Sequence, residues 1–281
     1  MELSKFSWNE FIYGGHWLSI GASAIALSTM ILLGFTIRWE FLLIVYLGTQ
    51  CIYNYNHYRE IDKDSLNGSE RVEHLKKYDS HIPTITAIYG VLYLSLLVYF
   101  GENQSIFFGG FLLILGLLFT YRGKNISKRI VGFKSVYTAF SWALLPIFTA
   151  IYVSYQINET LILFFLFVFL RWMVNTVTFD IKDTKNDKKE KLLTFPIVYK
   201  TKLPILLHML NLLSFMPLMI GIYLDLIPSY VFVLLLLFFY SFYYIEKAKS
   251  ENVDVQSIYY LIVDGEYYYW PILLLVGLII I

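Results

Sequence analysis

Long apolar runs recur along the whole chain, and each has about the length that an α-helix needs to cross a lipid bilayer. Counting runs of roughly 17–25 residues gives nine candidate spans. They lie at residues 11–34, 41–58, 83–100, 106–121, 134–153, 160–179, 204–223, 227–245 and 267–281. Because a membrane-spanning segment must satisfy its backbone hydrogen bonds internally, the runs predict an all-α, multi-pass transmembrane bundle of about nine helices, formed by a single domain over residues 1–281.

Composition excludes an ordinary soluble domain. Of the 281 residues, 58% are hydrophobic and only 15% are charged, whereas roughly a quarter of an average soluble domain is charged. The net charge of +1 gives no reason to expect a nucleic-acid partner, and no protein partner is indicated. The single cysteine, Cys51, excludes an internal disulfide and a cysteine-based metal site. We therefore expect an integral membrane protein surrounded by lipid.

The basic residues predict an orientation in the membrane. Alternate loops, counted from the N-terminal segment, hold 20 of the 22 Lys and Arg residues. The other side keeps only Arg38, and Arg171 lies within the sixth span. Since positively charged loops stay in the cytoplasm, we expect the N-terminus in the cytoplasm and the C-terminus outside, in a bacterial inner membrane.

Three carboxylates follow the sixth apolar run. Asp180, Asp183 and Asp187 lie at i, i+3 and i+7, so a continuing helix places them on one face. Such a cluster beside a membrane is costly unless a cation neutralises it. Hard oxygen ligands that leave room for water and phosphate favour Mg²⁺.

A second polar stretch ends the second apolar run. Asn54, Tyr58 and Asp62 lie at i, i+4 and i+8, again on one helical face. Both stretches lie on the predicted cytoplasmic side of the membrane. Two helices would then present oxygen ligands at one membrane surface.

Together the two stretches resemble the motifs of the UbiA superfamily of intramembrane prenyltransferases. N-Y-N-H-Y-R-E-I-D at residues 54–62 is similar to that family's N-x-x-x-D-x-x-x-D motif. D-I-K-D-T-K-N-D at residues 180–187, followed by T-F-P at residues 194–196, resembles its D-x-x-x-D motif with a downstream T-L-P. The resemblance covers the whole chain. It implies a nine-helix bundle with a lateral opening to the bilayer and an active site at the cytoplasmic side.

The resemblance also implies an activity. Members of the family bind an isoprenyl diphosphate through Mg²⁺, ionise it to an allylic carbocation and transfer the prenyl group to a lipophilic acceptor such as a quinone precursor. Matched position by position, the expected metal ligands are Asn54, Asp62, Asp183 and Asp187, with Asp180 as an auxiliary acid. The residues expected to act in catalysis are Asp62, Asp183, Asp187 and Tyr58.

Tyr58 departs from the family pattern, because it stands where the first motif has its central Asp. A tyrosine with a pKa of about 10 is a poor ligand for a hard cation. Asn56 or Glu60 are other sources of an oxygen ligand, although neither lies on the Asn54–Asp62 face. The departure keeps two alternatives open, an intramembrane terpene cyclase and a catalytically silent lipid-binding or transport relative.

Basic side chains near the carboxylates are candidates for binding the diphosphate. Lys128 and Lys134 lie near the start of the fifth run, and Lys182 lies between Asp180 and Asp183. Cations of this kind stabilise a departing diphosphate. The alternative for each lysine is a topological role, because positive charge on this side is expected in any case.

A polar stripe leads towards the carboxylates from within the sixth span. Arg171 and Asn175 precede Asp183 and Asp187 at multiples of four, so we include both as candidate ligands of the diphosphate. The alternative for Arg171 is pairing with a polar group on a neighbouring helix. For Asp264 and Glu266, before the ninth run, spacing identifies no partner. S-E-R-V-E-H-L-K-K-Y at residues 69–78 predicts a short amphipathic helix over the cytoplasmic mouth, with His74 at its surface.

Overall fold

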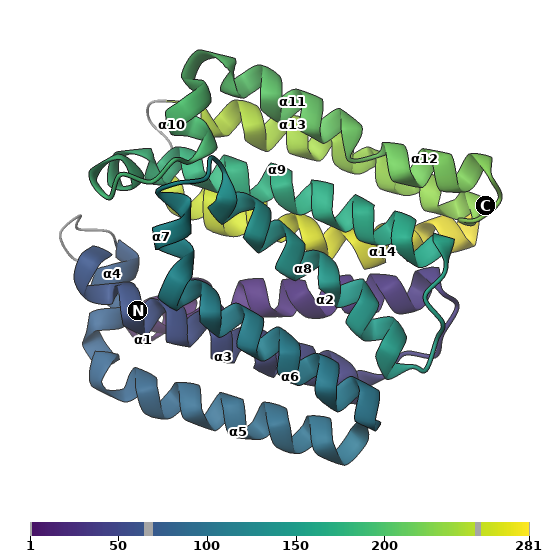
Figure 1. The fold of residues 1–281 in the computed structure, drawn as a ribbon, viewed down its shortest axis with the longest axis horizontal. Coiled ribbons are helices and arrows are strands. Elements are labelled where there is room, and N and C mark those ends of the chain that lie inside the picture. The colour runs from purple at the N-terminus through teal and green to yellow at the C-terminus, as the bar shows by residue number, and fades with distance from the viewer. Residues whose placement is uncertain (1, 65–69, 251–253, 281) are drawn as a thin grey trace.

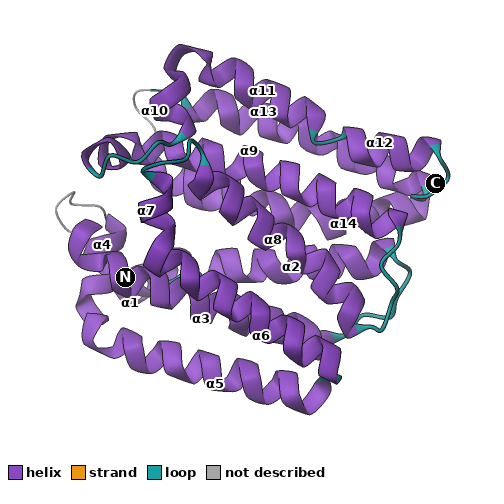
Figure 2. Ribbon diagram, in the orientation of Figure 1, coloured by secondary structure: helices purple, strands orange, loops and turns teal. Residues whose placement is uncertain are grey.

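The computed structural model describes residues 2–64, 70–250 and 254–280, and every regular element within these ranges is helical (Figure 1, Figure 2). The α-helices are α1 (Glu2–Tyr13), α2 (His16–Leu32), α3 (Trp39–Asp64), α4 (Glu70–Leu75), α5 (Ile82–Phe100), α6 (Asn103–Leu118), α7 (Lys124–Ser127), α8 (Phe133–Tyr152), α9 (Glu159–Lys189), α10 (Phe195–Tyr199), α11 (Leu203–Leu213), α12 (Met216–Tyr223), α13 (Leu237–Ala248) and α14 (Asp264–Ile280). Segments of 3-10 helix cover Lys76–His81, Lys200–Lys202 and Ser229–Leu236, and π-helical segments cover Phe119–Gly123 and Gln256–Val263. The predicted all-α fold class is confirmed.

The number of membrane crossings was predicted to be nine. Within the described ranges, six helices or runs of contiguous helices are long and apolar enough to cross a bilayer. A seventh candidate is the pair α1 and α2, which is bent by 51°, and α6 is apolar but shorter. The multi-pass arrangement is thus borne out by length and composition, while the count of nine stays a prediction.

The bend between α1 and α2 depends on a glycine. Gly15 has a φ of 83°, and a Cβ atom there would lie 2.7 Å from the ring of Tyr53 in α3. A side chain is therefore excluded both by the backbone conformation and by the close approach of α3. The bend turns α1 away from the direction of α2 and against α4.

The predicted helix over residues 69–78 is present as α4 and the 3-10 segment after it. Glu10 of α1 holds this segment, because its Oε2 lies 2.8 Å from His74 Nε2 and accepts a 2.5 Å hydrogen bond from the hydroxyl of Tyr78. The hydroxyl of Tyr13 also donates to Glu70 Oε2, at 2.9 Å. The surface position predicted for His74 is wrong: the residue is only 2% exposed, because a distant helix covers it.

The bundle packs around one large apolar core. The most extensive contacts are between α3 and α5, between α8 and α9, and between α2 and α14. The core includes Ile25, Phe41, Phe164 and Leu207, all fully buried. Large apolar side chains such as Tyr99 also cover the outside of the bundle, which suits contact with lipid.

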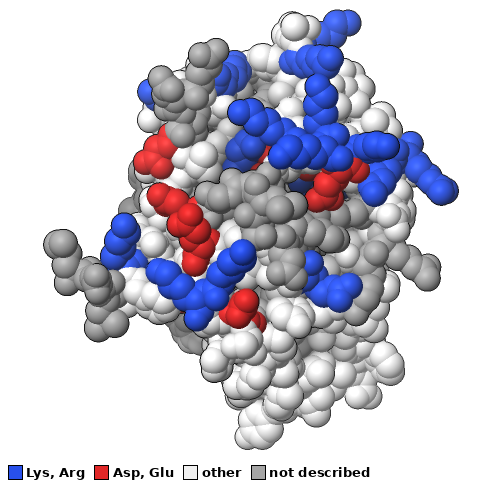
Figure 3. Space-filling model, turned by 90° about the vertical axis from the view of Figure 1, so that its left-hand side faces the viewer, with Lys and Arg blue, Asp and Glu red and all other residues white. Residues whose placement is uncertain are grey.

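The two ends of the bundle differ in character. The short elements α4, α7 and α10 lie at one end, at the left in Figure 1, and the described chain finishes at the opposite end. Lys and Arg side chains gather on the first end, with acidic side chains among them (Figure 3). The loops that carry most of the basic residues therefore lie together, as the charge pattern of the sequence predicts.

Candidate active site

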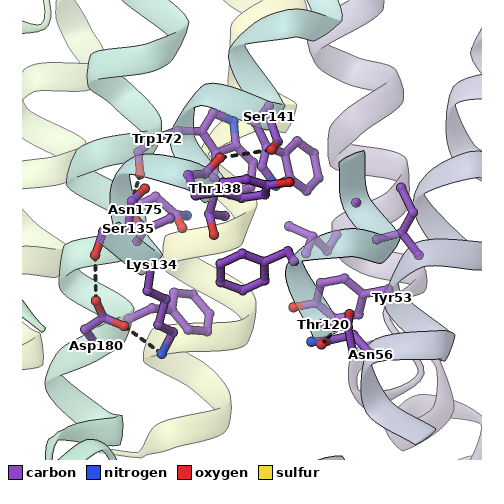
Figure 4. Close-up of a pocket in the computed structure, with 18 of the residues that line it drawn as sticks. Tyr53, Asn56, Thr120, Lys134, Ser135, Thr138, Ser141, Trp172, Asn175 and Asp180 are labelled. Atoms are coloured by element: carbon purple, nitrogen blue, oxygen red, sulfur yellow. Dashed lines mark hydrogen bonds and ion pairs between the residues drawn. The ribbon is translucent and has the colours of Figure 1, made fainter. Parts of the chain in front are cut away.

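A cavity of about 900 Å³ lies inside the bundle and reaches the basic end. This volume is within the usual range for sites that hold small molecules. One wall comes from α3 and α6, and the opposite wall from α8, α9 and the start of α14. Figure 4 shows polar side chains on both walls, with Asp180 and Lys134 facing Asn56 and Thr120 across the space.

The three predicted carboxylates share one wall of the cavity. The helix α9 continues ten residues beyond Phe179, to Lys189, so Asp180, Asp183 and Asp187 keep their helical spacing and all line the cavity. Asp180 and Asp187 are 2% and 5% exposed. The sequence prediction that these residues lie on one face is therefore confirmed.

Neighbouring side chains hold the carboxylates in place. The hydroxyl of Ser135 donates to Asp180 Oδ2 at 2.7 Å, and the ammonium of Lys134 lies 2.9 Å from Asp180 Oδ1. The same ammonium is 3.8 Å from Asp187 Oδ1. Lys182 donates to both oxygens of Asp183, at 2.8 and 2.9 Å. Two lysines thus pair with three acids at the polar end of the cavity.

The donor set fits a hard divalent cation only in part. Among the described residues, no three His, Cys, Asp or Glu side chains are grouped closely enough to hold a metal ion. Asp187 Oδ2 is buried and has no hydrogen-bond partner within the described part of the chain, so one carboxylate oxygen is available as a ligand. The oxygen ligands suit Mg²⁺, and further ligands must come from the opposite wall or from a substrate.

The opposite wall departs from the predicted first motif. Neither Asn54 nor Tyr58 lines the cavity: Asn54 is buried elsewhere, and Tyr58 is 42% exposed on the outside of α3. Asp62 lies in the last turns of α3, but its side chain is outside the described residues. Asn56 takes the cavity position instead, and its Oδ1 accepts a 3.2 Å hydrogen bond from Thr120.

Helical geometry explains this difference. Residues two apart on an α-helix point in directions that differ by about 200°. One face of α3 therefore carries Asn54, Tyr58 and Asp62, as predicted. Asn56 lies on a different face of the same helix. The cavity lies on the Asn56 face of α3.

The basic candidates separate into two groups. Lys134 and Lys182 line the cavity, whereas Lys128 is exposed and does not. Asn175 also lines the cavity, and its Nδ2 lies 3.3 Å from Asp264 Oδ1 and 3.3 Å from the carbonyl oxygen of Val263. Both lysines were candidates because they lie near the start of the fifth apolar run. In the structure Lys128 precedes α8, whereas Lys134 lies in its first turn and lines the cavity.

Arg171 lies away from the cavity, so the predicted contact with a diphosphate is replaced by a contact between helices. Its guanidinium pairs with Glu266 of α14 and donates to Asn211 Oδ1 at 2.7 Å and to Ser214 Oγ at 3.2 Å. The arginine is fully buried, and Glu266 supplies the compensating charge. The alternative interpretation of Arg171, pairing with a neighbouring helix, is the one that the geometry supports.

The deeper part of the cavity is apolar and aromatic. Trp142 and Trp172 both line it, with their rings stacked 3.9 Å apart, and Tyr267 stacks on Trp172 at 4.6 Å. Because α9 rises about 1.5 Å per residue, Trp172 lies roughly 16 Å along the helix from Asp183. The cavity therefore changes from charged to aromatic along α9.

Sequence reasoning missed several polar residues of the site. Ser135 and Thr120 contact Asp180 and Asn56 over separations of 45 and 64 residues. Arg71 of α4 also lines the cavity. No local spacing connects residues so far apart, and a Ser or Thr inside an apolar run carries no signal of its own.

A model of the UbiA prenyltransferase family matches residues 16–263. The chain belongs to the UbiA prenyltransferase family. The match includes every lining residue of the cavity except Asp264, the first residue of α14, and it agrees with the resemblance found in the sequence. Family and apolar helices together identify this UbiA family member as an integral, multi-pass membrane protein. No curated protein matches the chain.

Solved structures of low sequence identity share the fold of this UbiA family member. A structure concerned with digeranylgeranylglyceryl phosphate synthase in membranes is 16% identical over 100% of both chains, with a TM-score of 0.62. An apo UbiA homolog from Aeropyrum pernix K1 is 12% identical over 93% of this chain and 97% of that one, with a TM-score of 0.69. A UbiA homolog from Archaeoglobus fulgidus bound to GPP and Mg²⁺ is 12% identical over 95% and 99%, with a TM-score of 0.68.

Proposed function

We propose that this UbiA family member transfers an isoprenyl group from an isoprenyl diphosphate to a lipophilic acceptor, in a Mg²⁺-dependent reaction that passes through an allylic carbocation. The observation that carries the proposal is the group of three carboxylates and two ammonium groups at one end of a cavity whose other end is aromatic. The homologs bound to GPP or DMAPP with Mg²⁺ support an isoprenyl diphosphate as the substrate.

On the α9 wall, Asp180, Asp183 and Asp187 would hold Mg²⁺. When bound, the metal supplies positive charge that stabilises the diphosphate as it leaves. The unpartnered oxygen of Asp187 supports this assignment, since a buried carboxylate oxygen without a hydrogen bond is costly unless a ligand satisfies it.

On the α3 wall, we assign the metal-binding face to Asn56. The backbone of α3 places Glu60 and Asp64 at i+4 and i+8 from Asn56, so these three positions share a face. Residues 56–64 then form N-x-x-x-E-x-x-x-D, with a carboxylate at the central position. This register replaces the one that used Asn54, Tyr58 and Asp62.

Lys134 and Lys182 are the proposed diphosphate ligands. Both ammonium groups lie at the carboxylate end of the cavity, where they can donate to phosphate oxygens once Mg²⁺ shares the acids. Preorganised positive charge lowers the barrier to breaking the bond between C1 and the diphosphate oxygen. The lysines therefore bind the substrate and promote its ionisation.

The aromatic part of the cavity is suited to the isoprenyl chain and the carbocation. Trp142 and Trp172 offer π faces that attract positive charge, and the surrounding apolar side chains keep water away from it. Water would otherwise quench the cation before the acceptor reacts.

Of the alternatives, the terpene cyclase was motivated by Tyr58 alone. Since Tyr58 does not line the cavity, its departure from the family pattern gives no reason to prefer cyclisation. A catalytically silent relative remains an outcome of the test below.

We further propose that the basic end of the bundle, with the N-terminus, faces the cytoplasm, because Lys and Arg gather there.

Diphosphate release from geranyl, farnesyl and geranylgeranyl diphosphate by the purified protein in detergent tests the proposal. We expect release that needs Mg²⁺, is lost in Asp183→Ala and persists in Asp225→Asn, a carboxylate change at an exposed turn. Equal rates in the wild type and Asp183→Ala, or no release from any of the three substrates, would contradict the proposed chemistry.

A further inference from the structure

A further carboxylate, that of Asp264, lies in the cavity away from the three on α9. Asp264 begins α14, lines the cavity and is only 4% exposed. Asn175 fixes it, since its Nδ2 lies 3.3 Å from Asp264 Oδ1. Asn175 is eight residues before Asp183, which corresponds to about 12 Å along α9. This carboxylate is therefore too deep to share a metal with Asp183.

The surroundings of Asp264 are those of the place where an acceptor would react. Trp172 lies one turn of α9 beyond Asn175, and Tyr267 lies one turn of α14 beyond Asp264, so the aromatic stack borders the carboxylate. The diphosphate ligands lie on the other side, towards Lys134 and Lys182. An acceptor between the carbocation and the aromatic stack would therefore contact Asp264.

Asp264 also lines a second cavity, of about 10 Å³. Its volume is close to that of one water molecule. His57 of α3 also lines it, is 4% exposed and has an Nδ1 atom with no hydrogen-bond partner among the described residues. Asp264 thus lines both cavities, and the smaller one also holds a second buried polar side chain, His57.

We propose that Asp264 is a catalytic base that removes the proton from a hydroxyl group of the acceptor. This inference rests on the proposed function and adds the chemical class of the acceptor to it. The bond between C1 and the diphosphate oxygen breaks, and its electron pair leaves with the diphosphate. The acceptor oxygen gives an electron pair to C1 and forms the new C–O bond, while its proton passes to the carboxylate of Asp264.

Two acceptor probes test the assignment with geranylgeranyl diphosphate and Mg²⁺. The first, 1-naphthol, keeps its proton at neutral pH and needs a base, whereas 2,4-dinitro-1-naphthol is already ionised and needs none. In Asp264→Asn we expect prenylation of 1-naphthol to fall about 100-fold relative to the wild type, the usual size of a general-base effect. The ionised probe should react equally with both proteins, and Asp264→Glu should recover part of the lost rate.

Controls separate this role from folding and from ionisation of the donor. The ionised probe is the control for donor ionisation, since it needs the carbocation but no base, and Asp225→Asn should behave as the wild type throughout. An equal loss with both naphthols, or no loss with either, would overturn the assignment of Asp264. A wild type that releases diphosphate but prenylates neither probe would overturn the hydroxyl acceptor and leave donor ionisation intact. No diphosphate release at all would overturn the proposed function and this inference with it.

Discussion

Lys134 of α8 places its ammonium nitrogen 2.9 Å from Oδ1 of Asp180 in α9. The same nitrogen is 3.8 Å from Asp187 Oδ1, so one lysine is shared by two buried carboxylates. This ion pair joins α8 and α9, two helices of the same wall, at the polar end of the cavity. It also places a cation where a diphosphate would arrive.

Replacing Lys134 with Met should therefore weaken substrate turnover strongly. We expect kcat/KM for the isoprenyl diphosphate to fall about 100-fold, because a preorganised positive charge is lost where negative charge develops. The comparison is Lys128→Met, which removes an exposed lysine close by in sequence. Steady-state diphosphate release measures both, and equal effects of the two changes would show that only overall charge matters.

The register of the first motif can be tested residue by residue. Asn56 lines the cavity and Asn54 does not, so Asn56→Ala should reduce Mg²⁺-dependent diphosphate release about 10-fold or more, as for lost metal-shell partners. Asn54→Ala is the matched control on the same helix. Tyr58→Asp should leave the rate unchanged, because Tyr58 lies outside the cavity. A gain of activity in Tyr58→Asp would instead support a metal-binding face formed by Asn54, Tyr58 and Asp62.

The α9 half of the site could be predicted from the sequence, and the α3 half could not. Asp180, Asp183 and Asp187 end a long apolar run and form one helical set, so only one face was available to them. Residues 54–64 contain two overlapping sets with the same spacing, one from Asn54 and one from Asn56. Periodicity identifies both faces but does not tell which one the neighbouring helices cover.

Partners far apart in the chain limited the prediction in the same way. The sequence makes Arg171 a candidate diphosphate ligand or the partner of a polar group on another helix, and that partner, Glu266, lies 95 residues later on α14. His74 was predicted at the surface because its own helix is polar, and Glu10 of α1 buries it. In both cases the local sequence pattern correctly predicts the helix that carries the residue. The partner of that residue depends on how distant helices pack, which the local pattern does not predict.

The buried pair of Arg171 and Glu266 should matter for stability rather than for the reaction. Arg171→Met leaves the Glu266 carboxylate buried without its counter-charge, and breaking such a pair costs about 3–5 kcal/mol. The double change Arg171→Met with Glu266→Gln removes both charges and should recover much of that loss. Unfolding by denaturant in detergent measures the difference. If Arg171→Met instead raised the KM of a normally stable protein, the residue would belong to the substrate site.

Mg²⁺ and diphosphate should bind to this protein together rather than independently. Lys134 and Lys182 already pair with the carboxylates of α9, and no three acids among the described residues are grouped around one point, so Mg²⁺ alone has little to gain. A diphosphate attracts the lysines and adds its own oxygens as metal ligands, which makes each ligand favour the other. We expect Mg²⁺ alone to leave the unfolding temperature unchanged, and Mg²⁺ with an isoprenyl diphosphate to raise it. At a hundredfold excess of ligand over Kd, the free energy of unfolding should increase by about 2.7 kcal/mol. Asp183→Asn should abolish the joint effect. A full shift with Mg²⁺ alone would mean that the protein supplies a complete metal site without its substrate.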